Sequence, residues 1–480
     1  MSSQRFVRNS LLLITVEMVA KALGVLFFIV IARFLGAGDL GIFAFAMALA
    51  NFIVIPCKFG FEDLIQREVS RNPEGTYSYF WALGAIKGLI SLISLGIFCL
   101  CVLLWAKTDP VVLILAVTFT LVYSFMEFTD SFFRANQRAE LELMVRLFFS
   151  VANILLGVAV LYAGYRLRGV LSAQVASVGA AVLLGLVILS RVAVRKKYRW
   201  EWGTIWRHLA AAIPFAGILV GLYISNQIGV VILTFLSGKV AVGYFAAAIR
   251  IFDALTLIPA AVMGAFLPVM SLYYVQSLGA FVRTLRFTFK YLFILSAPLV
   301  VITSLLGRSI ILFLYREPFA PAIPAMQILG TILIFSFWNY AGQTVLVARN
   351  RERLVLISIG TVAAINVSAN LLLIPAYSYL GACWAILATQ GIYCVILFTY
   401  MLPRYLGWRQ LLGLIAKPAL AAAIMALAVY LLREAHLFVA LFTGLAVYGG
   451  TLLALGGITA TDHNFLRSLV TPASRDLSVS

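Results

Sequence analysis

Three basic residues lie inside long apolar stretches of the sequence, namely Lys21, Lys87 and Arg250. A charged side chain at the centre of a membrane span costs about 2.5–3.5 kcal/mol, so each one that is retained marks a candidate functional group. Ammonium and guanidinium groups form strong charge-assisted hydrogen bonds with phosphate oxygens. These residues therefore predict a cationic cavity that binds an anionic, phosphate-bearing solute.

Two of the three bases have an acid on the same helix face. Glu17 lies four residues before Lys21, and Asp253 lies three residues after Arg250. Both spacings place the two side chains next to each other on a helix. Each pair can be a self-neutralising structural pair or a cavity group whose partner changes during transport, and the spacing leaves both roles open. Lys87 has no acid at helical spacing, so its partner must come from another segment.

A second set of charges lies at the ends of two neighbouring apolar stretches. Glu127 and Asp130 close one stretch, and Arg146 opens the next. These groups can pair across the helices as an inner gate, or they can form a salt bridge at the rim of the membrane, which is the commoner arrangement. Together with Glu17 and Asp253, they are the candidate groups for ion coupling or gating.

Other kinds of chemistry have no support in the sequence. The phosphate-binding loop GxxxxGK[ST] is absent, which argues against ATP hydrolysis. The five cysteines lie in apolar stretches without partners at metal-ligand spacing, and the three histidines are scattered. We therefore expect no catalytic residue, no metal site and no cofactor, and we expect that the chain is not an enzyme.

The elements that position these residues follow from the composition. Apolar residues make up 63% of the 480 residues and charged residues 11%, against about 45–50% and about 25% in a soluble domain. Only helices and closed barrels satisfy their backbone in lipid, and runs of this length are helical. We predict an all-α polytopic membrane protein with about 14 transmembrane helices of about 20 residues or more. Their predicted limits are 10–32, 40–57, 79–106, 111–131, 143–164, 169–193, 210–236, 241–270, 287–306, 324–347, 354–375, 380–402, 411–432 and 437–458.

The excess of basic residues predicts the topology. The chain has 36 Lys and Arg against 18 Asp and Glu, a formal net charge of +18. In a soluble protein this excess would indicate nucleic-acid binding, but in a multispan protein it follows from the positive-inside bias of cytoplasmic loops. Most of the basic residues lie on one side if both termini are cytoplasmic. We therefore predict that both termini are cytoplasmic, and that the excess charge reflects membrane topology with no nucleic-acid partner.

The chain resembles itself at a period of about 200 residues. Gly41-Ile-Phe-Ala-Phe-Ala-Met has a counterpart in Gly243-Tyr-Phe-Ala-Ala-Ala-Ile, and Pro56 and Pro259 follow at similar distances. Chance similarity among Ala-, Gly- and Phe-rich helices is the alternative. Six spans match six spans, so we predict two six-helix lobes related as a parallel repeat, an arrangement found in transporters. The predicted domains are 1–205 and 206–405 for the lobes, and 406–480 for two additional transmembrane helices and a cytoplasmic tail.

Two predicted inner loops are long enough to contain a helix at the membrane surface. The segment Phe61–Arg71 places apolar residues at helical spacing beneath a charged face, and Leu272–Phe289 does something similar with Arg283, Arg286 and Lys290. Such amphipathic segments usually lie in the interface plane. A solvated connector is the alternative for both.

Several motifs resemble one known family. The stretch IARFLGAGDLGIFAFAMAL at 31–49, followed by Gly60 and Ile65-Gln-Arg67-Glu-Val, is similar to the opening of polysaccharide-unit flippases. Further along, Arg349-Asn-Arg-Glu-Arg-Leu and Asn370-Leu-Leu-Leu-Ile-Pro375 resemble the same family. This is the O-antigen (Wzx-like) branch of the multidrug/oligosaccharidyl-lipid/polysaccharide (MOP) exporter superfamily. The resemblance covers essentially the whole chain, and its motifs are structural rather than catalytic.

The resemblance implies a MATE/MOP-like fold and a function. It implies an ion-gradient-driven flippase that translocates polyprenyl-diphosphate-linked oligosaccharide units across the cytoplasmic membrane, by alternating access, for cell-surface polysaccharide synthesis. Lys21, Lys87 and Arg250 would then engage the diphosphate or acidic sugars. The implied partners are the lipid-linked oligosaccharide, membrane lipid, and H⁺ or Na⁺ as the coupling ion.

Three alternatives remain at this point. MATE-type cation or drug exporters share the implied fold, but their cavity needs an unpaired acid, whereas Glu17 has Lys21 beside it. Peptidoglycan-precursor flippases also have cationic cavities. A membrane-embedded glycan polymerase or ligase, from a different class, would show a sizeable external loop with clustered Arg, His or Asp, and the predicted outer loops are short.

Overall fold

The structure is a computed structural model of the chain, and its described part is helical. The described residues are 3–58, 60–71, 73–105, 108–192, 202–349, 351–405, 407–434, 436–458 and 462. No strand occurs within these ranges. The all-α prediction is therefore confirmed for the described residues.

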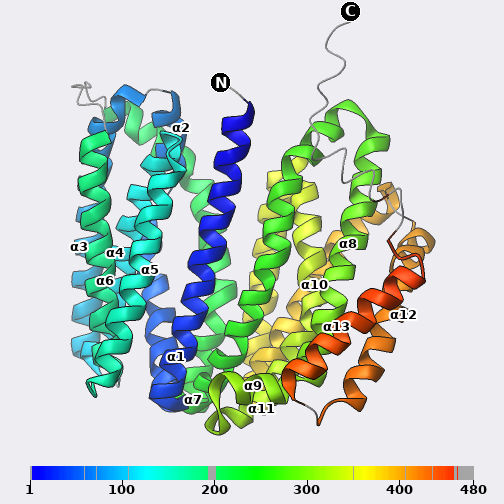
Figure 1. Ribbon diagram of the computed structural model, residues 1–480. Helices are drawn as coiled ribbons and strands as arrows, with labels where there is room; N and C mark the ends of the chain where they lie inside the picture. Colours follow the sequence, from blue (N-terminus) through cyan, green and yellow to red (C-terminus); the bar gives the residue numbers. More distant parts are fainter. Residues whose placement is uncertain are drawn as a thin grey trace, which may run out of the picture. The chain divides into compact units, whose positions relative to one another are not determined.

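Thirteen α-helices and two short 3₁₀ turns make up these ranges (Figure 1). The α-helices are α1 (Ser3–Lys58), α2 (Phe61–Arg71), α3 (Thr76–Trp105), α4 (Pro110–Ala135), α5 (Ala139–Tyr162), α6 (Leu167–Val192), α7 (Trp202–Gln276), α8 (Leu278–Leu305), α9 (Gly307–Tyr315), α10 (Ile323–Ala348), α11 (Glu352–Tyr405), α12 (Trp408–Leu431) and α13 (Leu437–Ala454). The 3₁₀ turns are η1 (Pro73–Gly75) and η2 (Glu317–Ala322).

The described residues include 11 helices that are long and apolar enough to cross a membrane. Three of these helices are interrupted by one residue with non-helical backbone angles: α1 at Gly36, α7 at Gly238 and α11 at Ser378. Each interruption separates two segments that are each long enough to span the bilayer. The chain is thus a multi-pass membrane protein, and dividing the three helices at their breaks gives the fourteen spans predicted from hydropathy.

The breaks in α1 and α7 support the internal repeat. Gly36 has φ 75° and ψ 176°, and Gly238 has φ 82° and ψ 175°. Only glycine adopts this region without strain. The two glycines are separated by the same number of residues as Gly41 and Gly243, the positions that revealed the repeat in the sequence. Two independent features therefore recur at one offset, which chance similarity does not explain.

Helices α1 and α7 cross in close contact just after these breaks. A Cβ atom on Gly41 would lie 1.7 Å from the carbonyl oxygen of Lys239, and a Cβ atom on Gly243 would lie 1.9 Å from the carbonyl oxygen of Ala37. The repeat relates the two contacts, because Gly41 is equivalent to Gly243 and Ala37 is equivalent to Lys239. Neither position accepts a larger residue unless the helices move apart.

Helix α2 forms where a surface helix was predicted, and it has the same limits. Its apolar face is buried, with Phe61, Leu64, Ile65 and Val69 each 5% exposed or less. These residues join a core cluster that includes Phe132 of α4. The amphipathic pattern of the sequence therefore reflects packing of α2 on the helical bundle.

The prediction of a second surface helix at 272–289 is wrong. Helix α7 continues to Gln276, and α8 begins at Leu278. The Ser277 hydroxyl accepts a hydrogen bond from the backbone N–H of Ala280, which is an N-cap. Phe281 and Leu285 are fully buried. The apolar residues of this segment thus belong to the ends of two spanning helices.

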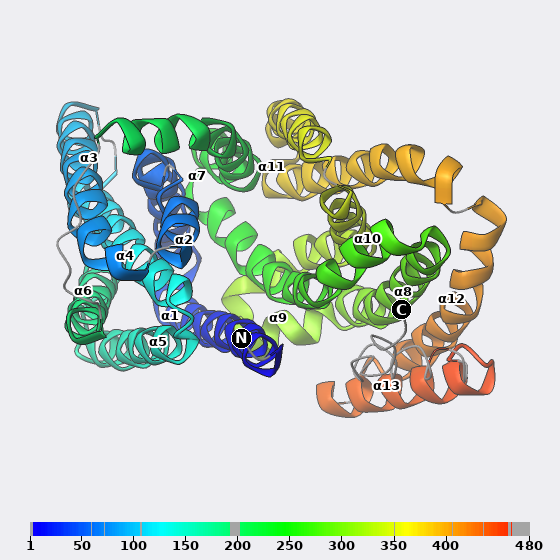
Figure 2. The ribbon, with the colours of Figure 1, turned by 90° about the horizontal axis from the view of Figure 1, so that it is seen from above.

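The chain divides into two compact units. The first comprises Met1–Ala254, Leu314–Ala325 and Leu356–Ala385, and the second comprises Leu255–Phe313, Met326–Val355 and Ile386–Ser480. In the first unit, α1 packs on α4 and α5, and α6 packs on α4 and α5 (Figures 1 and 2). In the second, α12 and α13 lie side by side and pack against α8.

One loop contact of the first unit explains where α4 begins. The Asp109 carboxylate accepts a hydrogen bond from the backbone N–H of Val111 at 3.1 Å and pairs with Arg168 of α6 at 2.6 Å. Pro110 then occupies the first helical position, which suits its fixed φ. The Arg168 guanidinium, followed by this backbone N–H, holds the pKa of Asp109 below its usual value.

Candidate functional site

Two of the three predicted bases lie together in the first unit. Lys21 of α1 and Arg250 of α7 are both close enough for their charges to act on the carboxylate of Asp253. Lys21 and Asp253 are exposed, and Arg250 is half-buried. We call these three residues the charged cluster. Among the described side chains, it joins one base from each sequence repeat around one acid.

The guanidinium of Arg250 is held against α1. Its Cζ atom lies 5.2 Å from the centre of the Phe28 ring, a cation–π contact. Its Nη2 atom would lie 3.5 Å from a Cβ atom added to Gly24. Gly24 and Phe28 are one turn apart on α1, so both meet the same side chain. The Nε atom of Arg250 is buried and has no hydrogen-bond partner among the described residues.

Lys87 lies elsewhere in the first unit and is fully buried. Its Nζ atom donates a hydrogen bond to the backbone carbonyl of Cys57 at 2.7 Å. The centres of three phenyl rings, those of Phe61, Phe125 and Phe128, lie 5.6–5.8 Å from the same atom. Cys57 is in the last turn of α1, where the helix dipole favours a cation. The partner expected from another segment is thus a helix end and an aromatic cage.

The remaining predicted charges form a buried ionic network at one end of α4 and α5. Arg146 Nε lies 2.9 Å from Asp130 Oδ2 and 3.1 Å from Glu142 Oε1. Arg134 pairs with Glu142 at 2.6 Å. Asp130 is fully buried, and its Oδ1 atom has no partner in the described part of the chain. The structure therefore brings Arg146 and Asp130 together, as the sequence allowed.

Glu127 pairs with a residue that the sequence did not single out. Its Oε2 atom lies 2.6 Å from Nζ of Lys58, the last residue of α1. Glu142 was also missed, although its position four residues before Arg146 is a signal of helical pairing. Glu17 lies on α1, but its side chain is outside the described part of the structure.

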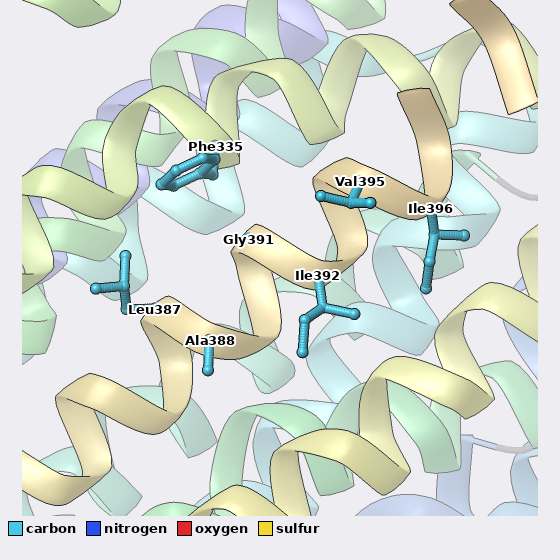
Figure 3. Close-up of a pocket in the computed structure, with 7 residues that line it drawn as sticks. All are labelled: Phe335, Leu387, Ala388, Gly391, Ile392, Val395 and Ile396. Carbon is cyan, nitrogen blue, oxygen red and sulfur yellow. The ribbon is translucent and has the colours of Figure 1, made fainter. Parts of the chain in front are cut away.

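An apolar cavity in the second unit is lined by one face of α11 and one residue of α10. Its volume is about 490 Å³. Figure 3 shows the lining residues, which are Phe335, Leu387, Ala388, Gly391, Ile392, Val395 and Ile396. None of them carries a polar side chain, so the cavity suits hydrocarbon and offers no chemistry for a polar solute.

The described ranges contain no set of side chains suited to bind a metal ion. Within them, no group of three or more His, Cys, Asp or Glu side chains is arranged to hold a metal ion. The five cysteines are free thiols.

The family of the chain follows from its sequence. Residues 6–274, more than half of the chain, match the family described as polysaccharide biosynthesis protein. The chain belongs to this family. No curated protein matches the sequence.

Solved structures show which fold this polysaccharide biosynthesis protein has. The lipid II flippase MurJ, in an inward closed conformation, matches with a TM-score of 0.73 at 14% identity, over 96% of this chain and 100% of that chain. An inward-facing multidrug resistance transporter of the MATE family, from the MOP superfamily, matches with a TM-score of 0.66 at 14% identity, over 85% of this chain and 99% of that chain. The predicted MATE/MOP-like fold is therefore confirmed.

Proposed function

We propose that the protein is a flippase that moves polyprenyl-diphosphate-linked oligosaccharide across the cytoplasmic membrane for the synthesis of a cell-surface polysaccharide. The family supports a role in polysaccharide biosynthesis. The fold is one that flippases and exporters share. The protein moves its substrate by alternating access, both termini face the cytoplasm, and an H⁺ or Na⁺ gradient drives the cycle. It carries out no covalent chemistry.

The charged cluster is the observation that carries this proposal. Lys21 and Arg250 come from equivalent lobes of the repeat and share one acid, Asp253. A diphosphate needs two or more cationic donors, and the planar fork of arginine matches phosphate geometry. We therefore assign the diphosphate to Lys21 and Arg250. Lys87 is already bound by a helix end and three rings, so it serves the fold.

The ionic network has a separate role in the proposal. Asp130 and Glu142 are buried within one helical bundle, and Arg146, which pairs with both, is largely buried. Removing one charge of a buried pair leaves the other uncompensated, so such a network holds helices in a fixed arrangement. In the proposed cycle it keeps α4 and α5 together while the lobes move as bodies.

The alternatives differ in the sign and place of the charge they need. A cation exporter needs acids without basic partners, whereas the acid of the charged cluster has two bases beside it. A peptidoglycan-precursor flippase needs the same cationic donors, so the sugar decides between it and the proposed function. A polymerase or ligase needs a polar catalytic site outside the spans, and none was predicted.

The proposed function can be tested by reconstitution. The full chain is inserted into liposomes with a fluorescent polyprenyl-diphosphate-linked disaccharide, and translocation is followed by quenching with dithionite, which does not cross the membrane. Lys21→Glu and Arg250→Glu should each reduce the translocation rate at least tenfold. Arg433→Glu is the matched control, because Arg433 is an exposed base at the end of α12 and should keep the wild-type rate.

Three outcomes would contradict the proposal. If both charge reversals translocate at the wild-type rate, the charged cluster does not bind the diphosphate. If the liposomes instead accumulate ethidium against an ion gradient, the protein is a cation exporter. If a peptidoglycan precursor is translocated and other lipid-linked sugars are not, the proposed substrate is wrong.

A further inference from the structure

The guanidinium of Arg250 lies against an aromatic ring of another helix. Its Cζ atom lies 5.2 Å from the centre of the Phe28 ring of α1, and its Nε atom is buried without a hydrogen-bond partner in the described part of the chain. Lys87 and Lys290 also lie against rings, but each of these ammonium groups has an oxygen partner as well. Arg250 differs from both, because a ring holds its guanidinium while one of its N–H groups has no described partner.

Packing fixes the ring of Phe28. Phe28 is 8% exposed, and its ring packs against that of Phe43, with 6.4 Å between the ring centres. Phe43 lies in the second segment of α1, beyond the break at Gly36. A buried ring in close packing cannot turn away without leaving a void. The ring that contacts Arg250 is therefore held in one position.

Gly24 leaves room for the same guanidinium. It lies one turn before Phe28 on α1, and a Cβ atom added there would lie 3.5 Å from Nη2 of Arg250, which is an ordinary van der Waals distance. Alanine therefore fits at this position, whereas the branches of a leucine would extend into the space that the guanidinium occupies. Gly24 and Phe28 together set where the guanidinium lies along α1.

An aromatic partner suits a cation that has to bind an anionic ligand. A cation–π contact attracts the guanidinium through the quadrupole of the ring and takes up none of its N–H groups. A carboxylate in the same place would accept those hydrogen bonds and neutralise the charge. Ordering a long flexible side chain at the moment of binding costs affinity, and a side chain that is already ordered avoids this cost.

We propose that Phe28 is a positioning residue of the diphosphate site, whose ring holds the guanidinium of Arg250 in place and leaves its N–H groups available to the phosphate oxygens. This inference rests on the proposed function, because it takes Arg250 as a ligand of the diphosphate. Phe28 acts through Arg250 and makes no contact with the substrate itself. The affinity for a diphosphate should therefore follow the strength of the ring quadrupole at position 28.

The test replaces Phe28 by phenylalanines with one, two or three fluorine atoms on the ring, which weaken the quadrupole stepwise and barely change the shape. Isothermal titration calorimetry measures how the purified full chain in lipid nanodiscs binds farnesyl diphosphate, which carries a diphosphate on a short prenyl chain. The affinity should fall with each fluorine, to about three- to tenfold below the wild type for the trifluoro ring. The same series at Phe27 is the matched control and should bind like the wild type, because Phe27 is buried on the same helix but contacts Gly157 of α5.

Two further sets of variants show that the ring acts through the guanidinium. Arg250→Gln should weaken binding about tenfold, and in its presence fluorination of Phe28 should no longer change the affinity, because the cation is gone. Gly24→Ala should bind like the wild type, whereas Gly24→Leu should weaken binding because it displaces the guanidinium. Thermal unfolding of each variant shows whether it is folded.

The outcomes separate this inference from the proposed function. If Arg250→Gln weakens binding and fluorination of Phe28 does not, Phe28 is not a positioning residue and the proposed function stands. If fluorination changes the affinity equally with and without the guanidinium, or raises it, the ring does not act by holding Arg250, which also overturns the inference. If the wild type does not bind farnesyl diphosphate, the proposed substrate itself is wrong, and the inference falls with it.

Discussion

Replacing Gly243 by alanine should force apart the crossing of α1 and α7. The added Cβ would lie 1.9 Å from the carbonyl oxygen of Ala37, whereas real Cβ contacts essentially never fall below 3.0 Å. The helices must therefore separate by about 1.1 Å or more. The carbonyl oxygen belongs to helical backbone and cannot swing aside as a flexible side chain would. Overpacking of this kind costs about 1–3 kcal/mol.

The measurement is the free energy of unfolding in one detergent, followed by tryptophan fluorescence. Gly243→Ala and Gly41→Ala should each lose about 1–3 kcal/mol. Gly38→Ala is the matched control, because Gly38 lies in the same segment and nothing would meet its Cβ within 4 Å. The free energy of unfolding of this control should equal that of the wild type or exceed it slightly, because alanine favours helix over glycine by about 0.5–1 kcal/mol.

The double variant tests whether the two contacts form one crossing. Once either alanine has separated the helices, the second meets less resistance, so the combined loss should be smaller than the sum of the two single losses. The reasoning is refuted if Gly243→Ala is as stable as Gly38→Ala. It is also refuted if the losses at Gly41 and Gly243 add fully, because the two positions would then act independently.

Three further predictions concern the charged groups of the first unit. Arg146→Met should lower the free energy of unfolding by about 3–5 kcal/mol because it leaves the buried Asp130 carboxylate uncompensated, and adding Asp130→Leu should recover part of that loss in the same denaturation assay. Lys87→Met should keep the affinity for farnesyl diphosphate, a short polyprenyl diphosphate, within about twofold of the wild type by calorimetry, because the Lys87 ammonium is bound to a helix end. A loss of affinity comparable to that of Arg250→Gln would show that Lys87 binds the substrate. The pKa of Asp109 is lowered in the folded state. Its contribution to the free energy of unfolding is therefore fully present above its unfolded pKa and is lost as the pH falls through its folded pKa. The wild type should therefore have a higher melting temperature than Asp109→Asn at neutral pH, and this difference should shrink in acid, whereas a constant difference would exclude the ion pair with Arg168.

Hydropathy predicted the spans because lipid imposes one strong rule. Every backbone group within the bilayer must bond inside its own helix, so the length of an apolar run sets the limits of a helix. The same rule does not distinguish a loop from a sharp bend. The first two spans were predicted as separate helices at 10–32 and 40–57, but Gly36 joins them with a single non-helical residue. The segment at 272–289 failed for a related reason, because Ser277 ends one helix and starts the next without a loop.

The candidate site was only partly readable from the sequence. Lys21, Arg250 and Asp253 were found because charge in an apolar stretch is visible locally. Phe28 was missed because an aromatic residue in a membrane helix is ordinary, and only the fold brings its ring to Arg250. Lys87 was visible as a charge, but the aromatic cage that accounts for it comes from two other helices, α2 and α4. Contacts between distant residues leave no trace in local periodicity.

Under the proposed function, the acid of the charged cluster gives the diphosphate site a means of releasing its substrate. Two bases alone would hold a diphosphate strongly, and a transporter that binds too tightly cannot complete its cycle. Asp253 lies close to both bases, so it competes with the substrate for the same positive charge. Without substrate, the acid compensates Lys21 and Arg250, and the empty site does not carry two unpaired cations. When the lobes move, a small change in the distance from Asp253 to either base alters the affinity of the site, because the interaction of charges is steep at short range. In the proposed alternating-access cycle, a site with two bases and an acid beside them would thus couple affinity to conformation.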